Sequence, residues 1–140
     1  TSVAPAPPDR LTRSSNPDSL TAVNPRNFSE FWPYYLGEHR SPLNRGLHYI
    51  GTSTALTVLA TAIVRGHWYL PLIGMLIGYG FAWVGHFFIE NNKPASFRYP
   101  LWSFLADIKM LRYKLTGRMA DEMTRLYGSP HPAPDAPLRR

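Results

Sequence analysis

Two long stretches of the chain carry no charged residue, and they lie almost next to each other. The first runs from residue 46 to 64 and the second from 66 to 89, and Arg45, Arg65 and Glu90 bracket them. Each stretch falls within the roughly 17–25 residues that a helix needs to cross a bilayer core. Because so few residues separate them, we predict a tight transmembrane helical hairpin.

The alternative is a pair of buried helices in a soluble bundle. Helices of soluble proteins usually carry a polar stripe on one face, and the segment Trp68–Ile89 has none. That absence favours membrane insertion. Small residues, including Gly74 and Gly78, let another helix approach closely and would also permit a homodimer.

The segments on either side of the hairpin carry patterns of their own. Residues 27–38 are aromatic, which suits a short helix or turn at the level of lipid headgroups. Residues 91–94, Asn-Asn-Lys-Pro, are expected to end the second apolar helix. Pro100 then opens a helical stretch that reaches about Tyr127, with a break expected at Gly117.

Apolar residues recur at steps of three and four along this last stretch: Leu101, Phe104, Leu105, Ile108, Leu111 and Leu115. The pattern is typical of an amphipathic helix in the membrane interface, and a helix that covers the hairpin as ordinary core is the alternative. The predicted fold class is therefore all-α, a membrane-embedded hairpin of two transmembrane helices flanked by interfacial amphipathic helices.

Both ends of the chain are poor in large apolar residues. Residues 1–26 and 128–140 are rich in proline and polar residues, and such segments cannot bury enough surface to offset the entropy of ordering. We predict two disordered tails around one helical membrane domain at residues 27–127.

The charge of the chain is distributed unevenly about the hairpin. The net charge is +6, and only Arg65 lies at the hairpin turn. The basic residues beyond the two outer ends are Arg40, Arg45, Lys93, Arg98, Lys109, Arg112, Lys114 and Arg118. By the positive-inside rule both termini should face the cytoplasm. The basic balance predicts contact with anionic membrane lipids, and without a recognition motif we expect no nucleic-acid partner.

Three of the five histidines can converge at one end of the hairpin. His48 begins the first apolar stretch and His86 ends the second, so an antiparallel pair places them at nearly the same depth. His39 precedes His48 by nine residues, and a break at Pro42 would let His39 fold back toward it. His67 lies at the turn and His131 in the C-terminal tail, where neither can join the cluster.

Such a cluster is a candidate metal site without sulfur ligands, because the chain has no cysteine. All-nitrogen ligation suits iron, zinc, copper or nickel. Structural zinc sites usually use cysteine, so three histidines with open positions favour a catalytic site that activates water or O2. Glu90 and Asp107 are candidate catalytic groups. Glu90 follows His86 by one helical turn and could be a ligand, a hydrogen-bond acceptor or a base, or could only pair with a nearby cation.

Two histidine motifs resemble a known family. They are F-x-x-F-W-P-Y-Y-L-x-E-H-x-x-P-x-N-R-x-L-H-x-I-G and G-Y-x-x-A-W-x-G-H-F-F-I-E-x-N-x-P-A-x-F-x-Y-P-x-W-S. Together they are similar to the small integral-membrane, iron(II)-dependent 2-hydroxy fatty acid dioxygenases of yeast and bacteria. The resemblance covers about residues 28–110 and implies localisation in the endoplasmic reticulum or a bacterial inner membrane.

That resemblance also implies roles for particular residues. His39, His48 and His86 would hold Fe(II), and the substrates would be O2 and a 2-hydroxy fatty acid that loses one carbon. As substrate-binding candidates we place Arg40, Arg45, Arg98 and Asn44 beside the metal. A metal hydrolase with Glu90 as base and a non-catalytic membrane scaffold are the rival interpretations.

Overall fold

The computed structural model describes residues 24–139, and all of its regular elements are helical. In chain order they are α1 (Phe28–Gly37), α2 (Pro42–Arg65), α3 (Leu70–Val84), the π-helical segment η2 (Gly85–Glu90), the 3-10 turn η3 (Ala95–Phe97), α4 (Pro100–Leu115) and α5 (Met119–Tyr127). The predicted all-α class is confirmed. The break at Gly117 is confirmed too, and that residue has a φ of +72°.

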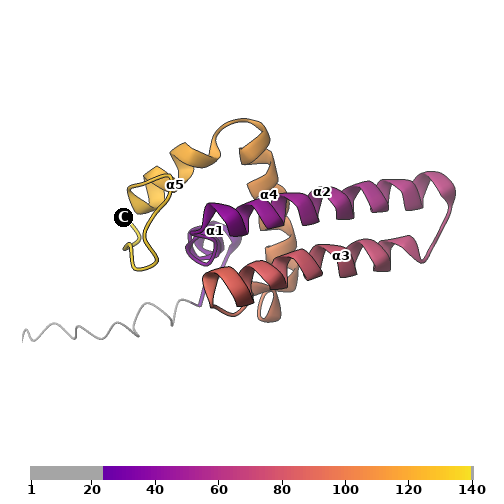
Figure 1. The fold of residues 1–140 in the computed structure, drawn as a ribbon, viewed down its shortest axis with the longest axis horizontal. Helices are drawn as coiled ribbons and strands as arrows, with labels where there is room; N and C mark the ends of the chain where they lie inside the picture. The colour runs from indigo at the N-terminus through magenta and orange to yellow at the C-terminus, as the bar shows by residue number, and fades with distance from the viewer. Residues whose placement is uncertain (1–23, 140) are drawn as a thin grey trace, which may run out of the picture.

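The predicted hairpin is formed by α2 and α3, which lie side by side along most of their length (Figure 1). The α2 helix ends at Gly66, whose left-handed backbone starts the turn. A Cβ added to Gly51 would lie 2.9 Å from the Cβ of Phe81, and one on Gly74 would lie 3.2 Å from the carbonyl oxygen of Ala55. The small residues therefore serve close packing inside this hairpin.

The helix boundaries near the histidines follow from local sequence. Ser41 caps α2 by accepting a hydrogen bond from the backbone N–H of Leu43, and Pro42 occupies the first turn, where a missing N–H has no cost. The predicted break between His39 and His48 is thereby confirmed. At the other end of the hairpin, η2 stops at Asn91, which adopts a left-handed conformation.

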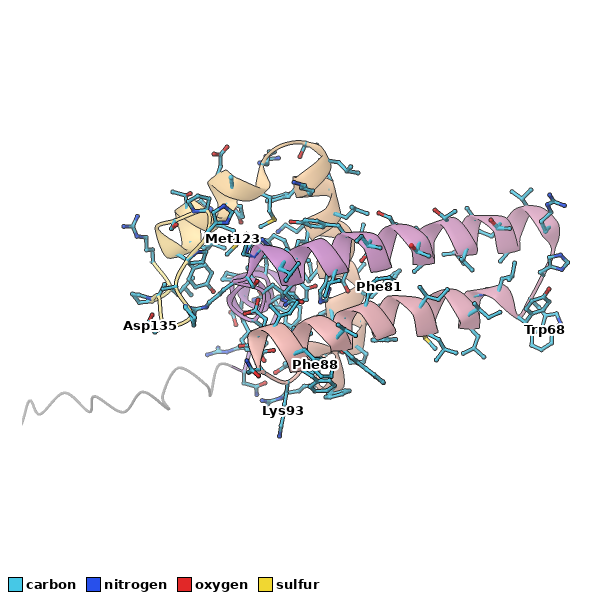
Figure 2. All side chains as sticks on the ribbon, viewed as in Figure 1. Trp68, Phe81, Phe88, Lys93, Met123 and Asp135 are labelled. Atoms are coloured by element: carbon cyan, nitrogen blue, oxygen red, sulfur yellow. The ribbon has the colours of Figure 1, made fainter. Side chains whose placement is uncertain are left out.

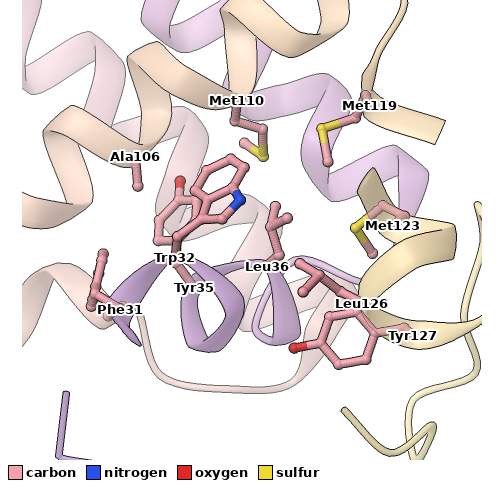
Figure 3. Packing of buried hydrophobic residues seen from close by; sticks show 11 residues of the cluster. Phe31, Trp32, Tyr35, Leu36, Ala106, Met110, Met119, Met123, Leu126 and Tyr127 are labelled. Atoms are coloured by element: carbon pink, nitrogen blue, oxygen red, sulfur yellow. The ribbon is translucent and has the colours of Figure 1, made fainter. Parts of the chain in front are cut away.

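The apolar core lies at the base of the hairpin, between α1, α4 and α5. Figure 3 shows it. Its buried members are Phe31, Trp32, Tyr35, Leu36, Ala95, Ala106, Met110, Met119, Met123, Leu126 and Tyr127. Trp32 also donates from Nε1 to Glu122 Oε1 at 2.7 Å, which ties α1 to α5. The aromatic segment before the hairpin is thus a helix packed into the core of the protein.

The far half of the hairpin has no such cover, and its large apolar side chains point outward (Figure 2). Trp68 at the turn is 88% exposed and Ile63 is 76% exposed. Both α2 and the continuous α3–η2 helix are long and apolar enough to cross a membrane. Apolar core helices of soluble proteins can be as long and as apolar but are mostly buried, whereas only 22% and 17% of the apolar windows of these two helices are buried.

The α4 helix crosses the hairpin near its base (Figure 1) and packs through an unexpected face. Its buried residues are Ser103, Ala106 and Met110. Leu101 and Leu115, which belong to the predicted apolar stripe, are 67% and 78% exposed. Small side chains let α4 lie close to its neighbours, and Leu101 and Phe104 of the stripe line a cavity that residues of α2 and α3 also line. The stripe therefore lies partly against the hairpin and partly on the exposed surface, and a position in the membrane interface stays a prediction.

The residues after α5 run back along the helices. Arg139 donates its backbone N–H to the carbonyl of Leu126, and Arg40 donates to the carbonyls of Ala133 and Ala136. The N-terminal tail predicted at residues 1–26 falls almost wholly outside the described residues. The division into two tails and one domain stays a prediction.

Candidate metal centre

Three histidines from three different segments meet at the base of the hairpin. His39 lies in the link between α1 and α2, His48 in the second turn of α2, and His86 in η2. All three side chains are buried, and one ring nitrogen of each lies within 4.8 Å of the others. The three histidines therefore converge as predicted, and His67 and His131 lie outside the cluster.

Two of the rings are oriented by acceptors that bind their Nδ1 atoms. His39 Nδ1 lies 2.6 Å from the backbone carbonyl oxygen of Tyr35, and His86 Nδ1 lies 2.7 Å from Asn92 Oδ1. The Asn92 amide nitrogen donates to Glu38, which turns the amide oxygen toward His86. Because a carbonyl oxygen can only accept, each Nδ1 carries the proton and each Nε2 keeps a free lone pair.

The third ring is oriented by a carboxylate. His48 Nδ1 lies 2.6 Å from Asp107 Oδ1, so it too is the donor. The same carboxylate oxygen accepts a short hydrogen bond from the Tyr35 hydroxyl. An imidazole that donates Nδ1–H to a carboxylate is a more basic ligand at Nε2. Asp107, a candidate catalytic group, thus binds and orients His48, and its catalytic role stays a prediction.

The Nε2 atoms of His39 and His48 face each other at 3.1 Å. Two lone pairs at this distance repel unless a proton or a cation lies between them. Two nitrogen ligands about 2.0–2.1 Å from one metal ion lie roughly 2.8–3.4 Å apart between the octahedral and the tetrahedral angle. The observed separation matches that range, so the three histidines fit a metal ion bound through Nε2.

Burial sets the protonation state of the groups around this site that lie outside the two long helices. It lowers the pKa of His39 well below its usual value, and the neighbouring His48 and His86 add to the effect. Burial also raises the pKa of the Tyr35 hydroxyl and of the Glu38 carboxyl. At neutral pH His39 is thus a neutral imidazole, the form that binds metals.

Glu90 and Asn44 join the two ends of the hairpin. Glu90 Oε1 accepts the backbone N–H of Ser41 at 2.7 Å and the Asn44 amide at 3.3 Å. Asn44 is fully buried, and its Oδ1 lies so close to Gly85 that a Cβ added there would be 1.8 Å away. These contacts hold the start of α2 against η2, and with it His48 against His86.

Arg45 is held away from the space between the histidines. It is 4% exposed and donates to the backbone carbonyls of His39, Arg40 and Pro130. A guanidinium that binds three carbonyls fixes the chain on both sides of the site. Its predicted contact with substrate stays untested, and its observed contacts all lie within the protein.

The other two candidate arginines lie further out. Arg40 donates to the Gly37 carbonyl and lies over the ring of Tyr127, while Arg98 is exposed and lies over the ring of Tyr99. Their substrate-binding roles also stay predictions.

A cavity of about 540 Å³ leads away from the histidines between α2, α3 and α4. His48, His86 and Asp107 line one end of it, and Leu59 and Met75 line the other. Most of its lining side chains are apolar, and no described lysine or arginine lines it. A cavity of this size and character is typical of a small-molecule site.

Sequence reasoning missed Tyr35 and Asn92, which orient the rings. Both lie inside the two quoted motifs, at the second tyrosine of W-P-Y-Y-L and at the asparagine of F-F-I-E-x-N. Their place beside the motif histidines was a usable signal. A tyrosine or an asparagine by itself does not indicate a metal site.

The fold and the site define a small helical protein with a buried three-histidine centre at the base of an apolar hairpin. A family model described as 2-hydroxy-palmitic acid dioxygenase Mpo1-like matches residues 25–119, and the chain belongs to this family. The resemblance expected from the two motifs is thereby confirmed. No curated protein and no solved structure matches the chain.

Proposed function

We propose that this protein is a membrane-embedded, Fe(II)-dependent dioxygenase that shortens 2-hydroxy fatty acids by one carbon. The observation that carries the proposal is the convergence of three buried histidine rings, of which His48 and His86 line the end of an apolar cavity. The family description supplies the reaction type. Three nitrogen ligands leave coordination positions for substrate and O2, and iron suits such a site.

Membrane insertion is supported by how little of the hairpin is buried inside the protein. Only 22% of the apolar window of α2 and 17% of that of the α3–η2 helix are buried. The positive residues gather near the base, so we place the base and both termini on the cytoplasmic side. The metal centre then lies near the interface, where a fatty acid presents its polar head.

The reaction balances with O2 as the only co-substrate. A 2-hydroxy acid and O2 give the acid one carbon shorter, CO2 and water, and the four electrons that the substrate loses reduce O2. The bound iron would supply the activation of O2 and of the chelated 2-hydroxy acid. Asp107 and the Tyr35 carbonyl keep the Nδ1 protons of His48 and His39 in place, so both rings present Nε2 throughout. Glu90 keeps a structural role, because its oxygens face the start of α2.

The test compares the wild type with His86→Ala in detergent-purified protein. We expect stoichiometric iron and O2 uptake with 2-hydroxyhexadecanoic acid in the wild type, and the loss of both in His86→Ala with membrane insertion intact. His67→Ala is the matched control, because His67 is an exposed histidine at the hairpin turn. Iron that persists in His86→Ala, or no metal binding by the wild type after anaerobic Fe(II) addition, would overturn the proposal.

A further inference from the structure

The cavity beside the metal centre has the length of a long acyl chain. At about 1.5 Å per residue, the stretch of α2 from His48 to Leu59 is about 16 Å long, and both residues line the cavity. An extended chain advances about 3.3–3.6 Å for every three backbone bonds, so about 16 Å corresponds to roughly 14 bonds. The cavity therefore accommodates a fatty chain whose tail ends near Leu59 and Met75.

One polar side chain in the cavity wall has no partner. Ser103 is 5% exposed, it lines the cavity, and its Oγ makes no hydrogen bond to any described residue. A serine inside a helix usually bonds to the carbonyl four residues earlier, and the same helix does this at Thr116, which donates to Arg112. A buried hydroxyl left unpaired is unfavourable.

Ser103 belongs to the metal end of the cavity. It precedes Asp107 by four residues on α4, so the two lie on one face of the helix about 6 Å apart along its axis. Asp107 in turn binds His48. A ligand whose head reaches the histidines passes this hydroxyl, whereas its tail meets mostly apolar side chains.

We propose that Ser103 donates a hydrogen bond to the carboxylate of the substrate and thereby sets its direction in the cavity, with the acyl tail running toward Leu59 and Met75. The inference rests on the proposed function. Since no described lysine or arginine lines the cavity, the carboxylate has the metal and neutral hydroxyls to bind, and among the described residues of the cavity wall Ser103 carries a buried hydroxyl without a partner. Ser103 closes the second sequence motif, at the last residue of Y-P-x-W-S.

The test measures equilibrium binding to full-length protein in nanodiscs, with 2-hydroxyhexadecanoic acid and its methyl ester as probes. Ser103→Ala should weaken binding of the acid about tenfold, as expected for a hydrogen bond to a charged group. Ser103→Thr keeps the hydroxyl and should restore binding. The ester carbonyl is only a neutral acceptor, so the loss of ester binding in Ser103→Ala should be smaller than the loss of acid binding. Ser53→Ala, at an exposed serine on α2, is the control.

Chain length provides a second measurement with the same proteins. Affinity for 2-hydroxy acids should rise with each added carbon until the chain fills the cavity, and then level off. Equal affinity of Ser103→Ala and wild type for the acid, with circular dichroism and iron content unchanged, would overturn the inference alone. Ser103-dependent binding without any O2 uptake would instead overturn the proposed function and leave the binding site standing.

Discussion

Replacing Asp107 with asparagine tests whether the hydrogen bond to His48 contributes to metal affinity. The substitution keeps an acceptor oxygen of nearly the same size but removes its charge. In the structure, the carboxylate oxygen lies 2.6 Å from His48 Nδ1 and 21% of the Asp107 side chain is exposed. The bond is thus a charge-assisted one that solvent partly screens.

The size of the effect follows from that geometry. Hydrogen bonds to charged groups contribute about 1.5–3 kcal/mol and neutral ones about 0.5–1.5 kcal/mol. The difference, about 1–1.5 kcal/mol, corresponds to roughly a tenfold change in a binding constant. This agrees with the about 10–100-fold losses seen when the partner of a ligating histidine is changed, and solvent screening places Asp107 at the low end.

The assay is anaerobic Fe(II) titration of detergent-purified protein against a competing chelator. Asp107→Asn should bind Fe(II) about tenfold more weakly than the wild type. Asp121→Asn, at an exposed position in the first turn of α5, should bind normally. Tyr35→Phe removes only the hydroxyl that donates to Asp107, and its effect should be smaller. Unchanged affinity in Asp107→Asn, with native circular dichroism, would refute the role given to this carboxylate.

Two further predictions concern stability. Gly85→Ala places a Cβ 1.8 Å from the buried Asn44 Oδ1 and should lower the free energy of unfolding by about 1–3 kcal/mol. Gly80→Ala, with open space around the added Cβ, is the control and should be neutral or stabilising. Equal melting temperatures for the two variants would contradict the packing argument. Burial raises the pKa of Tyr127 to about 12, and its hydroxyl donates to the Pro33 carbonyl at 2.6 Å. Its contribution is therefore complete below pH 10, where the unfolded tyrosine is still protonated, and is lost as the pH rises from 10 toward 12, by about 3 kcal/mol at most. Thermal unfolding between pH 9 and 11.5 should show this loss in the wild type and a flatter profile in Tyr127→Phe.

Hydrophobic patterning was sufficient for the helices because it reports local periodicity and length. The uncharged stretches bounded by Arg45, Arg65 and Glu90 became α2 and the α3–η2 helix, and Pro42 and Gly117 marked breaks. The histidines were predictable for the same reason, since an antiparallel hairpin of known helix lengths determines which residues lie at equal depth. None of these inferences required knowledge of a side-chain contact.

The face of α4 that packs inward could not be found in this way. Leu115 at the end of its apolar stripe is 78% exposed, and the small residues Ser103 and Ala106 are buried. A sequence pattern identifies an apolar face but does not say whether lipid or protein covers it. The same limit applies to the arginines, since the buried Arg45 donates both to the nearby carbonyl of His39 and to the carbonyl of Pro130, 85 residues away.

By itself, the sequence determined the all-helical class, the hairpin and the three histidines at its base, because each depends on residues close together along the chain. Only the tertiary structure decided which nitrogen of each ring is free. That depends on Tyr35, Asn92 and Asp107, which reach the rings from α1, the loop after η2, and α4. A side-chain hydrogen bond leaves no periodic trace in the sequence, whether its partner is four residues away, like the Tyr35 carbonyl, or 59 residues away, like Asp107. Such partners are identified only when the chain is folded.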